Sequence, residues 1–211
     1  LSGNVASLEE VHLPGPGTRM AEMEQWRALR NDGGIIFLLN RSDQPLDRMS
    51  YNASMHHSAL KECSGISLER ISSHLSASDP SNWASASITS GYATPGAINS
   101  QHLVMEHSED VVDLNPKIIS PDMDGHEDIL AIRIRTDQDN PVLTIIVTDL
   151  NGYSRRELMV NGLAGPDEVV CWDGCNDAGN PLPAGIYVIH VRIFSGSGEK
   201  VFRKAVGIRY R

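Results

Sequence analysis

The sequence predicts an all-β protein made of two consecutive immunoglobulin-like β-sandwiches. Apolar residues of the second half alternate with a period of two, turn dipeptides separate the alternating runs, and no helical segment interrupts them. Hydrophobic residues make up 40% of the 211 positions and charged residues 21%, so the chain has enough apolar side chains to bury a core. This length favours one or two domains.

The second half contains about seven short strands over roughly a hundred residues, the pattern of an immunoglobulin-like sandwich. Residues 129–135 alternate between apolar side chains and arginine, and residues 142–147 are β-branched and apolar, which predicts a central strand. Asn151-Gly152 is a hairpin-turn dipeptide. Further strands are expected at 156–160, 167–172, 186–193 and 200–208.

The first half also predicts mainly strands. Residues 34–40, G-I-I-F-L-L-N, predict a buried strand, and further strands are expected at 46–51 and 67–71. One short amphipathic helix is expected, because apolar residues recur at every third position. Those residues are Met20, Met23, Trp26 and Leu29.

Composition changes near residue 103, where a Ser-, Asn-, Ala- and Gly-rich half gives way to an acidic stretch that ends before Asn115-Pro116. We therefore expect a first domain at 1–103, an acidic linker at 104–113 and a second domain at 114–211, with the two halves folding independently. The chain begins Leu1-Ser2-Gly3, without an initiator methionine or a signal peptide, and we expect it to be an internal or processed piece of a longer protein.

Charge and composition argue against several classes of partner. The formal net charge of −9 disfavours a nucleic-acid binder, and an aromatic content of 5% disfavours a stacking platform. No run approaches the roughly 18 apolar residues of a membrane span. We expect a monomer whose partner is a protein or a surface ligand that the sequence does not name.

Trp83 and Trp172 are expected to anchor the cores. Tyr187, which follows Pro183-x-Gly185, is expected to be a corner tyrosine whose hydroxyl bonds the backbone. Among the cysteines, Cys171 and Cys175 are either bridged or both reduced, and Cys63 is far from them in the sequence.

Several segments of the first half carry a family resemblance, and their order along the chain is part of it. They are N-D-G-G-I-I-F-L-L-N (31–40), L-D-R-M-S-Y (46–51), His56-His57, G-I-S-L-E-R-I (65–71), Asn82-Trp83 and A-T-P-G-A-I-N-S (93–100). With these segments the first half resembles a lamin-tail domain of the type found in secreted Bacteroidetes proteins. The opening strand of that family is not evident in residues 1–30, so we expect the domain to be shortened at its N-terminus.

The second half has motifs of its own: I-S-P-D-M-D-G-H-E-D (119–128), D-L-N-G (149–152), W-D-G (172–174) and P-A-G-I-Y (183–187). It resembles the Ig-like C-terminal module of secreted and surface Bacteroidetes proteins, which is related to the Ig-like domain of the flagellar hook-cap protein and to type IX sorting domains. The sorting versions carry an aromatic R-W-G where this chain has L-N-G, which argues against a sorting role.

Both resemblances imply a binding or architectural role without catalysis. We therefore expect a non-catalytic binding, adhesion or anchoring fragment of a secreted or cell-surface bacterial protein, located outside the cytoplasm. The alternatives are an accessory region of a nuclease-like hydrolase whose catalytic domain lies upstream, and a secretion-sorting module. The sequence has no G-x-S-x-G, H-E-x-x-H or phosphate-loop motif, so we expect no enzyme in this chain.

The loop that begins at Asp122 is the candidate metal site. Asp122, Asp124, Glu127 and Asp128 place four carboxylates around a glycine turn, which suits Ca²⁺. An EF-hand is excluded, because position 12 of the loop is Arg133 rather than a bidentate glutamate. The alternative is a solvated acidic turn. Asp173, Asn176 and Asp177 are additional candidate ligands from the W-D-G loop.

Two charged pairs in the first half have stronger structural interpretations than catalytic ones. Glu69 and Arg70 are expected to form a structural ion pair on a strand. His56 and His57 are adjacent on an extended segment and point to opposite faces, so we do not expect them to share a metal. One of them is expected to pack against Tyr51 or Trp83.

Overall fold

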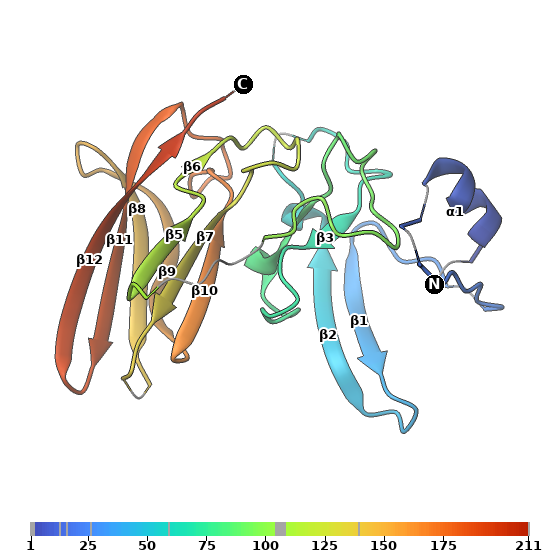
Figure 1. Cartoon of the computed structure of the whole chain (residues 1–211), viewed down its shortest axis with the longest axis horizontal. Coiled ribbons are helices and arrows are strands. Elements are labelled where there is room, and N and C mark those ends of the chain that lie inside the picture. Colours follow the sequence, from blue (N-terminus) through green and yellow to red (C-terminus); the bar gives the residue numbers. More distant parts are fainter. Residues whose placement is uncertain are drawn as a thin grey trace. The chain divides into compact units, whose positions relative to one another are not determined.

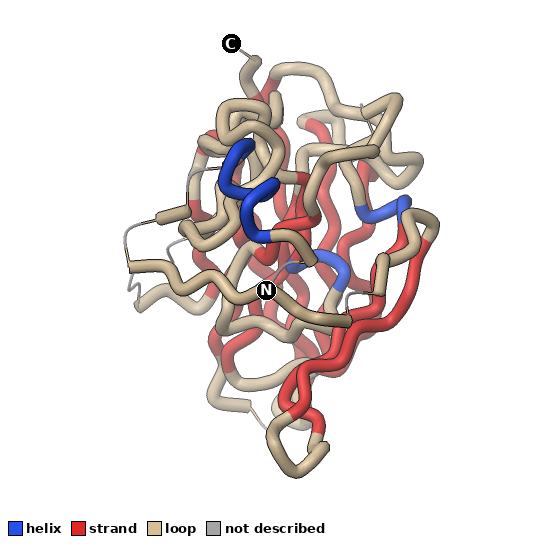
Figure 2. The backbone as a smooth tube through the Cα atoms, turned by 90° about the vertical axis from the view of Figure 1, so that its right-hand side faces the viewer, coloured by secondary structure: helices blue, strands red, loops and turns tan. Residues whose placement is uncertain are grey.

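The protein is all-β, as predicted. The structure is a computed structural model, and it describes residues 3–12, 14–15, 17–25, 27–58, 60–103, 109–138 and 140–210. Apart from the helix α1 (Val5–Val11) and the short 3₁₀ turns η1 (Ala53–Met55) and η2 (Pro80–Asn82), the regular elements of the described residues are strands (Figures 1 and 2). None of the described helices is long and apolar enough to cross a membrane.

The chain divides into two compact units. The first comprises Leu1–His102 with Met123–Gly125, and the second comprises Leu103–Asp122 with His126–Arg211. The described residues of the first unit form two two-stranded sheets and not the predicted sandwich. That the second unit is immunoglobulin-like, and that each unit folds by itself, stay predictions.

The second unit is a β-sandwich of two sheets (Figure 1). The three-stranded sheet has the order β10 (Asp167–Trp172), β7 (Leu130–Arg135), β5 (Val112–Asn115). The five-stranded sheet has the order β6 (Ile118–Ile119), β12 (Gly198–Ile208), β11 (Gly185–Ser195), β8 (Val142–Asp149), β9 (Ser154–Leu163). All pairs are antiparallel except β6 with β12. Strand β5 begins at Val112, inside the stretch predicted as a linker, because it pairs with β7 from Val112↔Ile134 onward.

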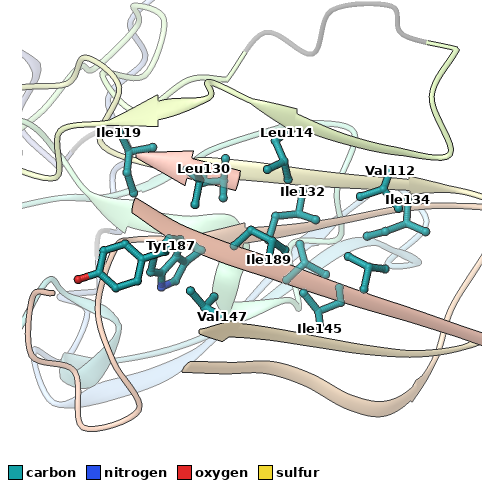
Figure 3. Packing of buried hydrophobic residues seen from close by; sticks show 14 of the residues in the cluster. Val112, Leu114, Ile119, Leu130, Ile132, Ile134, Ile145, Val147, Tyr187 and Ile189 are labelled. Atoms are coloured by element: carbon teal, nitrogen blue, oxygen red, sulfur yellow. The ribbon is translucent and has the colours of Figure 1, made fainter. Parts of the chain in front are cut away.

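A continuous apolar core joins the two sheets of the second unit. Figure 3 shows side chains of β5 and β7 facing those of β8 and β11. Ile132 and Ile134 of β7 are fully buried, as are Ile145 and Val147 of β8. The period-two alternation seen in the sequence therefore sorts each strand into an inward apolar face and an outward face.

Trp172 and Tyr187 close one end of this core, as predicted. The two rings meet edge to face with centroids 6.1 Å apart, an arrangement favoured by the ring quadrupoles. Trp172 Nε1 donates to the carbonyl of Cys175 at 2.9 Å, and Tyr187 Oη donates to the carbonyl of Pro183 at 2.9 Å. Burial raises the pKa of the Tyr187 hydroxyl. The corner tyrosine is thus confirmed.

The first unit has much less regular structure. Strands β1 (Gly33–Leu39) and β2 (Pro45–Asn52) form a two-stranded ribbon, and β3 (Leu68–Arg70) pairs with β4 (Trp83–Ser85). The helix expected around Met23 is wrong: residues 20–25 and 27–29 are not helical, and Trp26 lies outside the described residues. Met23 and Leu29 are exposed, so these two residues of the predicted apolar face lack the packing that stabilises such a short helix.

The prediction that residues 34–40 form a buried strand is half wrong. Strand β1 is present, but its side chains from Ile35 to Leu39 are exposed, because no sheet formed by the described residues covers the ribbon. Only Ile71, Ala77 and Ala86 are buried apolar side chains among the described residues of this unit. Buried polar side chains outnumber them: Glu69, Ser72, Asn82, Ser85, Ser87 and Gln101.

The Tyr187→Phe substitution tests the corner of the second unit. It removes one hydroxyl and leaves the Pro183 carbonyl without that donor, so we expect the free energy of unfolding to fall by about 1 kcal/mol. Denaturant unfolding followed by tryptophan fluorescence measures the change. Tyr153→Phe is the matched control, since Tyr153 is exposed, and it should leave stability unchanged. Equal effects of the two substitutions would contradict the assignment.

Candidate functional site

Glu69 is the centre of a buried hydrogen-bond network in the first unit. It lies on β3 and is 5% exposed. Its Oε2 accepts from the backbone N–H and from the hydroxyl of Ser100, both at 2.7 Å, and its Oε1 accepts from the hydroxyl of Thr94. A single carboxylate thereby fixes the loop 94–100 to strand β3.

The network continues into the segments next to β3. The Ser100 hydroxyl also accepts from Ser87 N at 2.8 Å, and Asn99 Nδ2 donates to the carbonyl of Arg70 at 2.8 Å. The fully buried Asn82 accepts from Ser72 N at 2.9 Å and donates to the Ser72 and Ser76 carbonyls. Most of these residues belong to the segments on which the lamin-tail resemblance rests.

The expected ion pair between Glu69 and Arg70 is wrong. Adjacent strand residues point to opposite faces, so Glu69 points inward with Ile71, whereas Arg70 points outward. The Nη1 of Arg70 pairs with Asp47 Oδ2 at 2.8 Å, and its Nη2 donates to the carbonyl of Leu75. Both charged groups therefore have structural partners, and neither is poised for proton transfer to the other.

The two histidines and Trp83 also serve the first unit's structure. His56 Nδ1 lies 3.0 Å from Ser85 Oγ, which also accepts from the backbone N–H of His57 at 3.0 Å. Burial lowers the pKa of His56. Trp83 is half-buried rather than a core anchor, and its Nε1 donates to the carbonyl of Ala77 at 2.9 Å. It is half-buried because the part of this unit that the structure describes has two separate two-stranded sheets, which do not enclose its ring.

An open groove of about 610 Å³ runs beside this network. Its lining includes Leu8 and His12 from the α1 end of the chain, and Trp83, Arg70 and Asn99. Arg70 and Asn99 direct hydrogen bonds to the chain itself, as described above. Arg70 and Asn99 therefore stabilise the chain around the groove.

Three of the four predicted metal ligands come together in the acidic loop. One carboxylate oxygen from each of Asp122, Asp124 and Asp128 lies within 4.8 Å of the others. Calcium–oxygen distances of about 2.3–2.6 Å allow ligands up to roughly 5 Å apart around one ion, so this spacing fits Ca²⁺. Asp128 also accepts from Asp122 N at 3.1 Å. The presence of Ca²⁺ stays a prediction.

The remaining predicted ligands are engaged elsewhere. Glu127 lies outside the cluster and its Oε2 pairs with Arg209 at 2.5 Å, a contact between residues 82 positions apart. Asp173 accepts from Cys175 N at 3.0 Å and stabilises its own turn. Asp177 accepts from Glu157 N at 2.9 Å and so joins its turn to strand β9. Asn176 accepts from Ala178 N and Asn180 N within its turn.

The cysteines are reduced in this structure. Cys171 and Cys175 are buried and Cys63 is half-buried, and none of the three forms a disulfide. Of the two alternatives that the sequence left open, the structure has the reduced pair.

The outer face of the five-stranded sheet is a surface that the sequence analysis did not single out. Its residues follow from the register, because cross-strand partners lie on the same face. One row runs across three strands as Leu163, Val142 and Phe194. Leu163 is 77% exposed and Phe194 59%. Ile186 and Val201 are further exposed apolar residues of this face.

The polar residues in the middle of this face are mainly basic. His190 lies between Ile146 and Arg203 in the register, and its Nε2 is 2.9 Å from Thr148 Oγ1. Burial, and secondarily the charge of Arg203, lower the pKa of His190. Arg192 pairs with Glu199 at 2.5 Å, while Arg203 is exposed. The sequence does contain a signal for this apolar face. In residues 186–194 every second residue points outward, and three of these outward residues are apolar: Ile186, Val188 and Phe194.

No family model and no curated protein matches this chain. Part of it is similar to a solved structure of PorZ, described as an essential bacterial surface component of the type-IX secretion system of Porphyromonas gingivalis. The match has a TM-score of 0.32 and 14% sequence identity, and it covers 52% of this chain and 13% of the PorZ chain. A likeness at this level does not define a shared fold.

The Glu69→Gln substitution tests the network. Glutamine replaces one accepting oxygen with a donating NH2 group, so either the Thr94 donor or the two Ser100 donors lose their acceptor. We expect a loss of about 1–3 kcal/mol in the free energy of unfolding of the first unit. Chemical denaturation measures it, and Glu62→Gln, at an exposed position, is the matched control. A neutral Glu69→Gln would show that the network contributes nothing.

Thermal melting with chelator and with Ca²⁺ tests the acidic loop. If Ca²⁺ binds the folded protein with a Kd of about 0.1–1 mM, about 5 mM Ca²⁺ should raise the melting temperature by roughly 5–10 °C. Asp124→Ala should abolish most of this shift, whereas Asp137→Ala, in a separate turn, should preserve it. Superimposable wild-type curves in the two conditions would identify the loop as a solvated turn.

Proposed function

We propose that this chain is a non-catalytic, protein-binding part of a larger extracytoplasmic bacterial protein, with the outer face of the five-stranded sheet as its binding surface. The observation that carries the proposal is an apolar row across three neighbouring strands, in which the exposed Leu163 and Phe194 flank the half-buried Val142. It lies on a rigid support, because the opposite face of the same strands packs in the core.

The composition of this face differs from an ordinary solvated sheet surface. The outward face of an antiparallel sheet is commonly polar, whereas here Ile186, Phe194 and Val201 are all about half exposed. Leu163, Val142 and Phe194 are cross-strand neighbours, whereas Ile186 lies at the other end of β11. Clustered exposed apolar side chains mark interaction sites, and aromatic residues and arginine are enriched at protein interfaces.

The charges on the face indicate the chemistry of the partner. Arg203 and Arg192 lie on this face beside the apolar residues. Arg192 is paired with Glu199, and Glu157 lies opposite Ile146, so the proposed charge complementarity rests on the exposed Arg203. A complementary partner surface would be apolar at its centre and acidic around it.

Two further considerations support the wider proposal. The motifs of both halves resemble lamin-tail and Ig-like modules of secreted Bacteroidetes proteins, which supports a position outside the cytoplasm. The charged side chains that a catalytic role would need in the first unit, Glu69 and Arg70, are committed to structural hydrogen bonds. These observations favour binding by this chain over catalysis by Glu69 and Arg70.

Site-specific photo-crosslinking in the producing cells tests the proposal. A benzoyl-phenylalanine in place of Phe194 should give a light-dependent adduct with a specific protein, because this side chain lies on the proposed interface. The same replacement of Tyr153, which is 67% exposed in the β8–β9 turn, is the control.

A charge reversal sharpens this test. Arg203→Glu, in the background with the Phe194 crosslinker, should lower the adduct yield several-fold if the partner is acidic around its apolar centre. Equal yields from positions 194 and 153, or the absence of an adduct at position 194, would contradict the proposed binding surface.

A further inference from the structure

The ribbon of β1 and β2 presents an apolar strand without a neighbour on its outer side. The side chains from Ile35 to Leu39 are between 38% and 60% exposed. Among the described residues the ribbon has two strands, so β1 has a free edge with no third strand beside it (Figure 1). The backbone N–H and C=O groups of such an edge are a template for another strand.

The edge of β2 differs from that of β1. Asp47 pairs with Arg70 at 2.8 Å, and the Arg48 carbonyl accepts from the hydroxyl of Ser78 at 3.0 Å, so the first unit already engages β2. Strand β2 also begins with Pro45, which cannot donate to a ladder. New strand pairing is therefore expected at β1.

The sequence of β1 is suited to pair with itself. Gly33–Leu39 contains no charged residue and no proline, so a second antiparallel copy brings no like charges together. In the register centred on Phe37, Ile35 lies opposite the second copy's Leu39, Ile36 opposite the second copy's Leu38, and the two Phe37 rings face each other. Each such pair of large apolar side chains stabilises a sheet.

In place of the monomer expected from the sequence, we propose that two copies of this chain associate through antiparallel pairing of their β1 strands around Phe37. The product is a four-stranded sheet of order β2-β1-β1-β2 with a two-fold axis, and it goes beyond the function proposed for the second unit. A lone two-stranded ribbon is marginally stable in water, whereas three or more strands with an apolar face are stable. The contact is isologous, so it closes at the dimer.

The size and charge of the contact set its strength. Pairing of two seven-residue strands covers on the order of 1,000 Å² in total, near the lower limit of specific interfaces, so we expect a dissociation constant in the micromolar range. Each copy carries a net charge of −9, which opposes association, and salt screens this repulsion. Association should therefore strengthen when salt is added.

Sedimentation equilibrium of the whole chain, from about 5 to 200 μM, tests this association. The wild type should shift from monomer to dimer over this range, and more readily at high salt. Phe37→Lys places two like charges opposite each other at the axis and should stay monomeric. Ile98→Lys, at a residue that is 78% exposed in the same unit, should dimerise as the wild type does. A monomeric wild type, or a Phe37→Lys variant that dimerises normally, would overturn the proposal.

A crosslinking variant tests the register without adding a charge. Directly opposed residues of antiparallel strands have Cα atoms about 4.5–5.5 Å apart, within the range of a disulfide. In a Cys63→Ser background, Phe37→Cys should therefore give a covalent dimer on mild oxidation, and Ile98→Cys should not. No crosslink from Phe37→Cys, or equal crosslinking from both variants, would reject this pairing and would leave the binding surface around Phe194 untouched.

Discussion

Burial of the apolar side chains of β7, β8 and β11 between two sheets is the interaction on which the second unit depends. Ile132, Ile145 and Ile189 are fully buried, and the edge-to-face contact of Trp172 with Tyr187 closes one end of their core. Because these strands are held firmly from inside, their outward side chains have fixed positions. That rigidity favours binding at the proposed surface of Leu163, Val142 and Phe194, since little conformational entropy is lost when a partner binds.

The first unit has no equivalent core and depends on polar contacts. Glu69 holds the loop 94–100, and Asn82 holds the segment that begins at Ser72. A buried carboxylate is costly unless all its hydrogen bonds are made, so such a unit is sensitive to single changes at these positions. Because no described sheet packs on the ribbon, the apolar residues of β1 lie at the surface. Pairing with β1 of a second copy, as proposed above, would bury them.

The second unit was largely predictable from sequence, and the first was not. The alternation in 129–135 correctly predicted strand β7 and the burial of Ile132 and Ile134, because alternate residues of a strand point to opposite faces of the sheet. The spacing of Pro183, Gly185 and Tyr187 gave the corner hydrogen bond, because that contact is local.

Non-local contacts account for what sequence reasoning missed. Glu127 was predicted as a metal ligand, but it pairs with Arg209, which is far from it in the sequence, and it lies outside the cluster of the other three carboxylates. The strand β1 has the composition of a buried strand, and only the absence of a covering sheet exposes it. The inward position of Glu69 could have been predicted from the sequence. Glu69 shares a strand face with the buried Ile71, so the alternation along the strand places its carboxylate inward.

Native-state hydrogen exchange of the whole chain tests most directly the claim that one unit rests on an apolar core and the other on a buried carboxylate. Amides of β7, β8 and β11 should exchange slowest and together, whereas those of residues 67–71 and 82–87 should exchange faster. Glu69→Gln should lower protection in the latter segments alone. Equal protection of both units, or a loss of protection in β8 and β11 with Glu69→Gln, would contradict this account.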